Sequence, residues 1–185
     1  GVLASTSICF DLSVFELFVP LSWGGTVILA ENILDLAELA CAEAVTLVNT
    51  VPSGIAGLLK GTTLPASVRT VNLAGEPLRP QLVREIEKAG TVESVYDLYG
   101  PSEDTTYSTK ALREREGPEI IGRPIANTQA YLLDRYMEPV PIGVSGEVYL
   151  GGEGLARGYY NRHTLTAESF IPNPFSRKRG ARLYK

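Results

Sequence analysis

Short apolar runs alternate with helix-like segments through the first two-thirds of the sequence, and this alternation constrains the fold most strongly. The apolar runs favour strands, and they lie at residues 26–31, 45–51, 69–75 and 92–99. Helices are expected between them, at residues 34–44, 55–60 and 79–90. Strands that are apolar throughout and separated by helices indicate an α/β fold with a mostly parallel sheet and flanking helices.

The clearest helix is the one expected at residues 79–90. Its apolar side chains share one face, together with the residue just before it: Leu78, Leu82, Val83 and Ile86. Pro80 and Gly90 punctuate the two ends, as is typical of helix starts and stops.

The pattern changes after about Lys110. A charged segment broken by Gly and Pro covers residues 113–119, and shorter strands with turn signals follow at 128–134 and 146–152. A last helix is expected at 164–169. This spacing predicts antiparallel β-structure or part of a barrel. We therefore expect an α/β part at residues 1–112 and a β-rich part at 113–185.

Composition excludes several classes of protein. Hydrophobic residues make up 44% and charged residues 21%, which is ordinary for a globular chain, and 17 Lys and Arg against 21 Asp and Glu give a net charge of −4. A weakly acidic chain lacks the basic footprint of a nucleic-acid partner or of binding to an anionic membrane. No run is long enough to span a bilayer and no secretory signal is present. We expect a cytoplasmic protein, with Cys9 and Cys41 buried as small hydrophobic residues.

Polar or flexible residues stand where the predicted strands end. Asn49 and Thr50 follow one strand, Gly75 and Glu76 the next, and Gly100 with Ser102 and Glu103 the last; these seven positions form the candidate site. Open α/β sheets bind ligands beyond the carboxyl ends of their strands, so the chemistry is expected there.

The stretch from Tyr99 to Thr106, YGPSEDTT, is the most informative. An aromatic ring for a base, the Ser102 hydroxyl for phosphate and the Glu103 carboxylate for Mg²⁺ would together suit a nucleotide. The alternative is a polar loop in which Ser102 caps a helix.

Two further stretches have two interpretations each. Asp11 lies among aromatic and aliphatic residues, where a carboxylate needs a cation such as a ligand ammonium; alternatively, Asp11 or Ser13 caps a helix. Gly75, in the segment AGEPL, either lets the backbone approach a ligand closely or only connects a strand to a helix.

Taken together and in order, these stretches resemble the adenylation domains of non-ribosomal peptide synthetases, which share a superfamily with acyl-CoA synthetases. The resemblance covers essentially the whole chain. Six collinear segments carry it: FDLSVFELF, NTVPS, NLAGEPL, YDLYGPSEDTTYST, IGRPIANTQAYLLD and GEVYLGGEGLARGYYNRHTLTAESFIPNPF. The chain is thus identified as part of the large N-terminal subdomain of an acyl-adenylate-forming enzyme.

The resemblance implies a reaction and a set of residues. ATP activates an amino acid as aminoacyl-AMP, and the acyl group passes to the phosphopantetheine of a carrier (thiolation) domain, next to a condensation domain. Glu103 matches a Mg²⁺ ligand and Ser102 a phosphate-contacting hydroxyl. The positions that match the nucleotide site are Gly75, Glu76, Pro77, Asp97, Tyr99, Gly100 and Ser102.

The resemblance also implies the amino-acid pocket. Asp11 matches the carboxylate that holds the α-ammonium. The other matching positions are Leu12, Phe15, Asn49, Asn72, Ala74, Leu98, Thr106 and Tyr107. This combination resembles alanine-activating domains, and a lining without a second charged residue suits a small, uncharged substrate. Two alternatives stay open: an acyl- or aryl-CoA ligase, which has no use for Asp11, and a non-catalytic binding or scaffold fragment.

Several of the family's motifs are not in this sequence. The phosphate loop is expected upstream of Gly1. The ribose-binding Asp and the catalytic Lys are expected beyond Lys185. We therefore expect an internal fragment that is inactive by itself.

Overall fold

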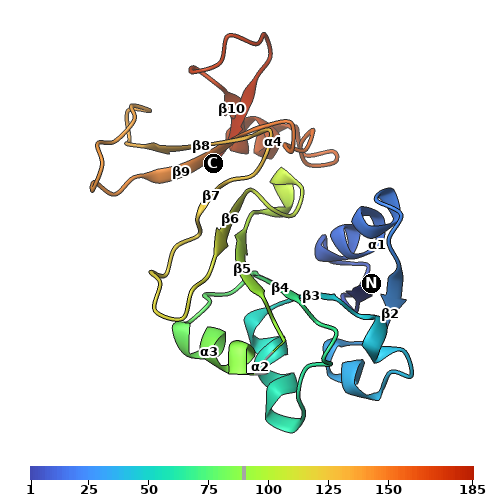
Figure 1. Cartoon of the computed structure of the whole chain (residues 1–185). Coiled ribbons are helices and arrows are strands. Elements are labelled where there is room, and N and C mark those ends of the chain that lie inside the picture. The colour runs from blue at the N-terminus through green and yellow to red at the C-terminus, as the bar shows by residue number, and fades with distance from the viewer. Residues whose placement is uncertain (89–90) are drawn as a thin grey trace. The chain divides into compact units, whose positions relative to one another are not determined.

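The computed structural model describes residues 1–88 and 91–185, so the predicted helix end at Gly90 lies outside the described residues. The chain forms two compact units. The first comprises residues 1–99 and 110–122, and the second comprises residues 100–109 and 123–185 (Figure 1).

The first unit is built on a mostly parallel sheet. Its strands are β1 (Val2–Ala4), β2 (Val27–Leu29), β3 (Leu47–Thr50), β4 (Thr70–Ala74), β5 (Ser94–Tyr99) and β6 (Thr109–Leu112). They follow one another in the order β2-β1-β3-β4-β5-β6. The pairs β1–β2, β1–β3, β3–β4 and β4–β5 are parallel. The expected parallel α/β architecture is confirmed.

Three α-helices accompany this sheet: α1 (Leu12–Ser22), α2 (Pro52–Gly61) and α3 (Pro80–Lys88). Helix α1 lies beside β1, β2 and β3, and α2 lies beside α3 (Figure 1). The apolar face predicted for α3 is confirmed, because Leu78, Val83 and Ile86 are buried and Leu82 packs against the core. Pro80 is the first residue of α3, where its missing N–H costs nothing.

The single helix expected at residues 34–44 is wrong. The structure has two 3₁₀ helices there, η1 (Ile33–Glu38) and η2 (Ala42–Ala44), and Leu39 between them is extended. Ile33 and Leu36 are buried three residues apart, which matches the 3₁₀ repeat, and Asn32 caps the first turn through Leu34 N. The packing of these apolar side chains overrides the helix propensity of Ala, Leu and Glu.

One continuous core fills the first unit. It draws on successive strands and on α2 and α3, with these representatives: Leu3, Val48, Val71, Val95, Ile55, Leu58, Val83 and Ile86. The outer face of α1 differs, since Val14, Phe18 and Leu21 on that helix are exposed. The site-bearing strands β3, β4 and β5 are therefore anchored by packing.

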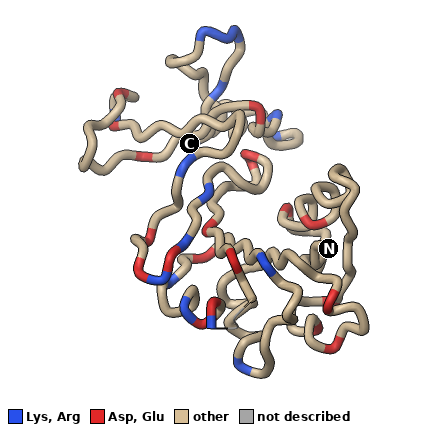
Figure 2. Tube along the Cα trace, in the orientation of Figure 1, with Lys and Arg blue, Asp and Glu red and all other residues tan. Residues whose placement is uncertain are grey.

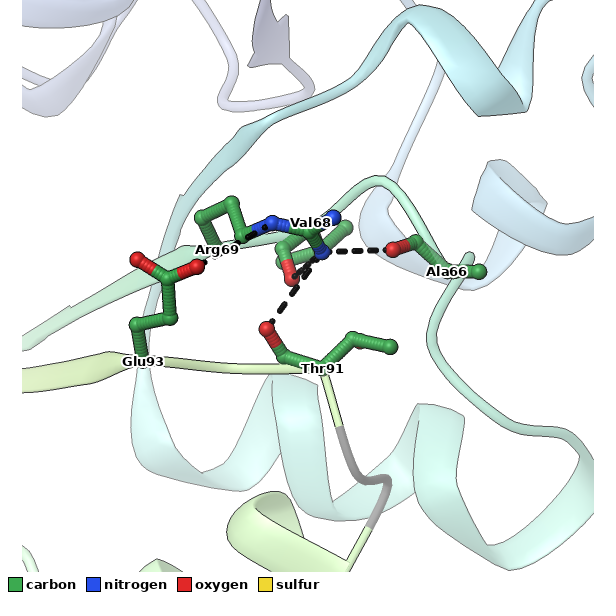
Figure 3. Close-up of polar contacts among 5 residues, drawn as sticks. All are labelled: Ala66, Val68, Arg69, Thr91 and Glu93. Atoms are coloured by element: carbon green, nitrogen blue, oxygen red, sulfur yellow. Dashed lines mark hydrogen bonds and ion pairs between the residues drawn. The ribbon is translucent and has the colours of Figure 1, made fainter.

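Arg69 fastens the amino ends of β4 and β5 (Figure 3). Its Nη1 donates to the carbonyl oxygens of Ala66 at 2.6 Å and of Val68 and Thr91 at 3.4 Å. Its Nε lies 3.3 Å from Oε1 of Glu93. These contacts stabilise the strand register at the edge opposite to the carboxyl ends, where the candidate site residues stand.

The second unit is an antiparallel sheet with short helices. Its elements are η3 (Ser102–Asp104), β7 (Arg123–Pro124), β8 (Thr128–Leu133), β9 (Glu147–Gly152), α4 (His163–Ser169), β10 (Phe170–Pro172) and β11 (Arg182–Tyr184). Four strands follow the order β10-β11-β9-β8, and all three pairs are antiparallel. This confirms the antiparallel prediction. The core of this unit is small and centres on Leu133, Tyr149 and Leu183.

The burial predicted for the two cysteines is wrong. Both are exposed, because Cys9 lies in a turn before α1 and Cys41 in the turn before η2, and neither position faces the sheet. Lys and Arg are scattered among Asp and Glu along the chain (Figure 2). None of the helices in the described residues has the length and apolar character needed to cross a membrane.

Candidate active site

Four of the predicted pocket residues stand on one face of the first sheet. Asn49 of β3 is in register with Asn72 of β4, and Ala74 of β4 is in register with Leu98 of β5. Since register-matched residues share a face and alternate residues along a strand return to it, all four side chains lie on the same side. All four are buried, and Asn49 is fully so.

Three more predicted pocket residues lie at the start of α1. Asp11 directly precedes the helix, and Leu12 and Phe15 follow on the same helical face, all half-buried. Among the described residues, the Asp11 side chain makes no capping hydrogen bond to α1. Ser13 does not cap it either, because its Oγ donates to the carbonyl oxygen of Phe10 at 2.6 Å. The alternative role as a helix cap is therefore not seen.

Glu16, one residue after Phe15, is a site-linked residue that the sequence analysis missed. It is fully buried, and its Oε1 accepts a hydrogen bond of 3.1 Å from Nδ2 of Asn49. The available signal was a lone carboxylate between Phe15 and Leu17 in an otherwise apolar helix. Such a group has to find donors when it is buried.

The turn after β4 carries Gly75, Glu76 and Pro77, which are all exposed. Gly75 has a φ of +82°, which a residue with a side chain adopts only with strain. The Glu76 carboxylate accepts hydrogen bonds from Ser53 N at 2.8 Å and Ser53 Oγ at 2.7 Å. It thereby caps the N-terminus of α2, so only the backbone of this turn is left to contact a nucleotide.

Asp97 and Tyr99 lie on the face of β5 opposite to Leu98. Asp97 is buried and paired with Arg113, whose Nη1 lies 2.8 Å from Oδ2 of Asp97. Burial raises the pKa of the Asp97 carboxyl, against the opposite effect of Arg113. Tyr99 is 38% exposed and so presents part of its ring to solvent.

The second unit holds the remaining predicted residues in one loop, residues 100–109. A Cβ on Gly100 would lie 2.6 Å from Ser108 N and 2.8 Å from the carbonyl oxygen of Thr106, so only glycine fits there. Thr105 and Thr106 have φ values of 54° and 72°, which are strained for β-branched residues. Such strain is typical of functional loops.

Ser102 and Glu103 begin the short helix η3 in this loop. The residue at the cap position is Pro101, so the alternative in which Ser102 is the cap is not seen. Ser102 is exposed and Glu103 half-buried, whereas Thr106 and Tyr107 are buried.

Glu103 is held from several sides within the second unit. Tyr159 Oη donates to its Oε1 at 2.5 Å, and Ala156 N donates to its backbone oxygen at 2.7 Å. Burial and its hydrogen bonding with Tyr159 raise the pKa of Tyr184, which also neighbours Glu103. The two phenols therefore surround the carboxylate as hydroxyl groups rather than as phenolates.

The carboxylate of Glu103 fits a Mg²⁺ ligand. Within residues 1–88 and 91–185 there is no group of three His, Cys, Asp or Glu side chains able to hold a metal by themselves. Mg²⁺ does not need one, because it usually takes one or two carboxylates together with substrate phosphates and water. A single, partly exposed and firmly held carboxylate suits that pattern.

Comparison with known families decides the classification. The family model described as AMP-binding enzyme matches residues 1–160. The chain belongs to this family. Among AMP-binding enzymes, it is 58% identical over 186 residues to one of the linear gramicidin synthase proteins from Brevibacillus parabrevis, covering all of this chain and 4% of that protein. It is 50% identical over 183 residues to AMB antimetabolite synthetase AmbB from Pseudomonas aeruginosa, covering 97% of this chain and 15% of that protein.

A solved structure agrees with this membership of the AMP-binding enzymes. A four-domain non-ribosomal peptide synthetase bound to AMP and glycine superposes with a TM-score of 0.86 at 33% identity, covering 99% of this chain and 14% of that one. The resemblance to adenylation domains of non-ribosomal peptide synthetases is thus confirmed. The chain spans only a small part of these relatives.

Proposed function

We propose that this chain is part of a domain that activates an amino acid with ATP for non-ribosomal peptide synthesis. The substrate carboxylate oxygen bonds to the α-phosphorus of ATP, the bond from that phosphorus to the bridging oxygen breaks, and pyrophosphate leaves. The acyl group of the resulting aminoacyl-AMP then passes to the phosphopantetheine thiol of a carrier domain. One observation carries the proposal: the sheet gathers Asn49, Asn72, Ala74 and Leu98 on one buried face.

In the first unit, the proposed task is to hold the amino acid. Asp11 pairs with the α-ammonium, and its half-buried place directly before α1, close in the chain to Leu12 and Phe15, supports this role. Leu12, Phe15 and the four strand residues surround the side chain of the substrate. Because Asp11 is the sole carboxylate among the proposed pocket residues and none of them is basic, a charged substrate side chain would be buried without a partner. A small, uncharged substrate such as alanine fits best.

In the second unit, the proposed task is to hold the phosphates. Glu103 binds Mg²⁺ and Ser102 donates a hydrogen bond to phosphate, while Thr106 and Tyr107 complete the amino-acid pocket. When bound, Mg²⁺ supplies positive charge that offsets the charge of the phosphates. The hydrogen bond from Tyr159 keeps the Glu103 carboxylate in one position, which favours a preorganised site.

The partners are proposed from the relatives. Synthetases of this kind join adenylation segments to further domains, and one solved relative is described as containing adenylation and carrier (PCP) domains. We propose a carrier domain and a condensation domain as neighbours of this chain in its full-length protein. The cytoplasmic location stays a prediction.

Pyrophosphate exchange by the full-length protein against all twenty amino acids tests the proposal. We expect an optimum for alanine, with some activity toward glycine and serine, because one methyl group in such a pocket discriminates by only about 1–3 kcal/mol. An optimum for an aromatic or charged amino acid would reject the pocket assignment. The isolated 185-residue chain is the matched negative control, and exchange by that chain above background would contradict its assignment as an inactive part.

A further inference from the structure

Glu16 is a buried carboxylate that the proposed reaction does not use. It is fully buried in α1 and accepts four hydrogen bonds. Oε2 accepts from Ser5 N and Thr6 N, both at 3.0 Å. Oε1 accepts from Thr6 Oγ1 at 2.6 Å and from Asn49 Nδ2 at 3.1 Å. In the described part of the chain no Lys, Arg or His forms an ion pair with it, so hydrogen-bond donors alone compensate this carboxylate.

These bonds join three elements of the first unit. Glu16 belongs to α1, Ser5 and Thr6 follow β1, and Asn49 stands in β3. Of the partners, only Asn49 is also a proposed pocket residue. The contact is therefore a direct link between a buried charge and the proposed recognition of the substrate.

The link fixes the orientation of the Asn49 side chain. A carboxylate can only accept hydrogen bonds, so the group that Asn49 turns toward Glu16 has to be its NH₂. Because the carboxamide is planar, its Oδ1 then points to the other side. Asn49 is fully buried, and a carboxamide flip would bring its oxygen against the carboxylate, so that orientation is disfavoured.

We propose that Glu16 is a positioning residue for amino-acid selectivity, which acts by keeping the Asn49 oxygen, rather than its NH₂, toward the substrate. This inference rests on the proposed function, since it takes Asn49 as a pocket residue. A fixed acceptor suits a small substrate and tolerates a hydroxyl that can donate to it, as in serine. It disfavours side chains that present a carbonyl at that place.

The first test is Glu16→Gln in the full-length protein. The backbone N–H groups of Ser5 and Thr6 hold the glutamine oxygen, so its NH₂ faces the NH₂ of Asn49, and Asn49 has to turn over. We expect the kcat/KM ratio of the preferred amino acid to serine to change by about tenfold or more, chiefly through the KM values of the amino acids. The KM for ATP should not change. Glu38→Gln, at an exposed carboxylate of η1, is the matched control and should leave the ratio unchanged.

The second test is the double variant Glu16→Gln with Asn49→Asp. An aspartate accepts from the glutamine NH₂ on one side and still presents an acceptor oxygen on the other. It therefore restores both the pair and the polarity toward the substrate, and we expect the selectivity to return to within about threefold of the original protein. A merely structural role predicts no such return, because it depends on packing and not on which atom accepts.

Three results would overturn the inference: a selectivity ratio within about twofold of the original in Glu16→Gln, equal losses for ATP and all amino acids without recovery in the double variant, or loss of folding in both variants by circular dichroism. The proposed function is tested separately by the unmodified protein. If that protein prefers another amino acid, the ratio is taken relative to that amino acid; if it activates none, the proposed function fails and the inference fails with it.

Discussion

The two units hold their candidate site residues by different means. In the first unit, Asn49, Asn72 and Leu98 stand on strands whose other residues pack into one continuous core. In the second unit, Ser102 and Glu103 stand on a loop, and the core there is small and centred on Leu133, Tyr149 and Leu183. Hydrogen bonds hold this loop: Tyr159 to Glu103, and Thr105 to the carbonyl oxygen of Gly154.

This difference bears on how each part of the site responds to change. A strand-end residue keeps its place as long as the core is packed, so its position and the stability of the unit are coupled. A strained loop with Thr105 and Thr106 at positive φ depends on a few polar contacts instead. Substitutions in the loop should therefore alter activity with little change in stability, whereas substitutions among the strands should alter both.

The largest effect is expected at Asp11, which tests whether the first unit also contains a residue that acts purely in binding. Asp11→Ala leaves the substrate ammonium without its anion, which should cost on the order of 3–5 kcal/mol in amino-acid binding. Stability should change little, because the side chain makes no capping bond to α1. Exchange kinetics with the amino acid, and binding of an analogue that lacks the amino group, give the measurement. Equal losses for both compounds would contradict the assignment.

Glu103 probes the loop of the second unit. Glu103→Gln keeps the shape of the side chain but removes the charge that suits Mg²⁺, so exchange activity should fall about 10²–10³-fold, or about 3–4 kcal/mol. The thermal midpoint should stay close to that of the original protein. Glu138→Gln, at an exposed position of the same unit, is the matched control. Near-normal exchange in the Glu103 variant would return this residue to a structural role.

Asp97 probes the coupling of position and stability in the first unit. Asp97→Ala leaves the buried guanidinium of Arg113 unpaired and should lower the free energy of unfolding by about 3 kcal/mol. Denaturant unfolding of the full-length protein measures this, and an unchanged midpoint would break the comparison between the units.

The same carboxyl predicts a pH dependence. Burial raises its pKa above 3.8, so the folded state binds this proton more tightly than the unfolded state does. Its contribution to stability therefore decreases as the pH rises from about 3.8 through the raised pKa. Asp97→Asn should remove this part of the pH dependence, and an identical pH profile in that variant would contradict the sign.

Phe15 sharpens the comparison within the proposed pocket. Phe15→Ala should make room for a larger apolar side chain and improve kcat/KM for valine relative to alanine by about 1–3 kcal/mol. Because Phe15 is only half-buried, the loss of stability should be smaller than for a core residue. Exchange assays with both amino acids check this, and an unchanged ratio would remove Phe15 from the pocket.

The smallest effect is expected at Tyr159. Tyr159→Phe removes the hydroxyl that donates to Glu103 and should reduce exchange activity by about 1 kcal/mol, with the KM for Mg·ATP rising more than kcat falls. The ring packs edge-on against Phe170 and should keep its place. Phe in place of the exposed Tyr160 next to it is the control. Equal effects of both changes would contradict the positioning of Glu103 by Tyr159.

Local sequence patterns determined much of the fold. Apolar runs predicted β2 to β5, and the helical repeat predicted α3 with its buried Val83 and Ile86. The motif YGPSEDTT and the strand ends indicated which residues to examine, and register then showed that Asn49 and Asn72 are neighbours. These predictions succeeded because repeat patterns and turn signals depend on residues that are close in the chain.

Only the tertiary structure decided the rest. The segment at 33–44 became two 3₁₀ helices because the burial of Ile33 and Leu36 outweighed propensity. Glu16 bonds to a residue 33 positions away and Tyr159 to one 56 positions away. No periodicity in the sequence encodes such pairs, since a buried carboxylate or hydroxyl takes whichever partner folding brings within reach.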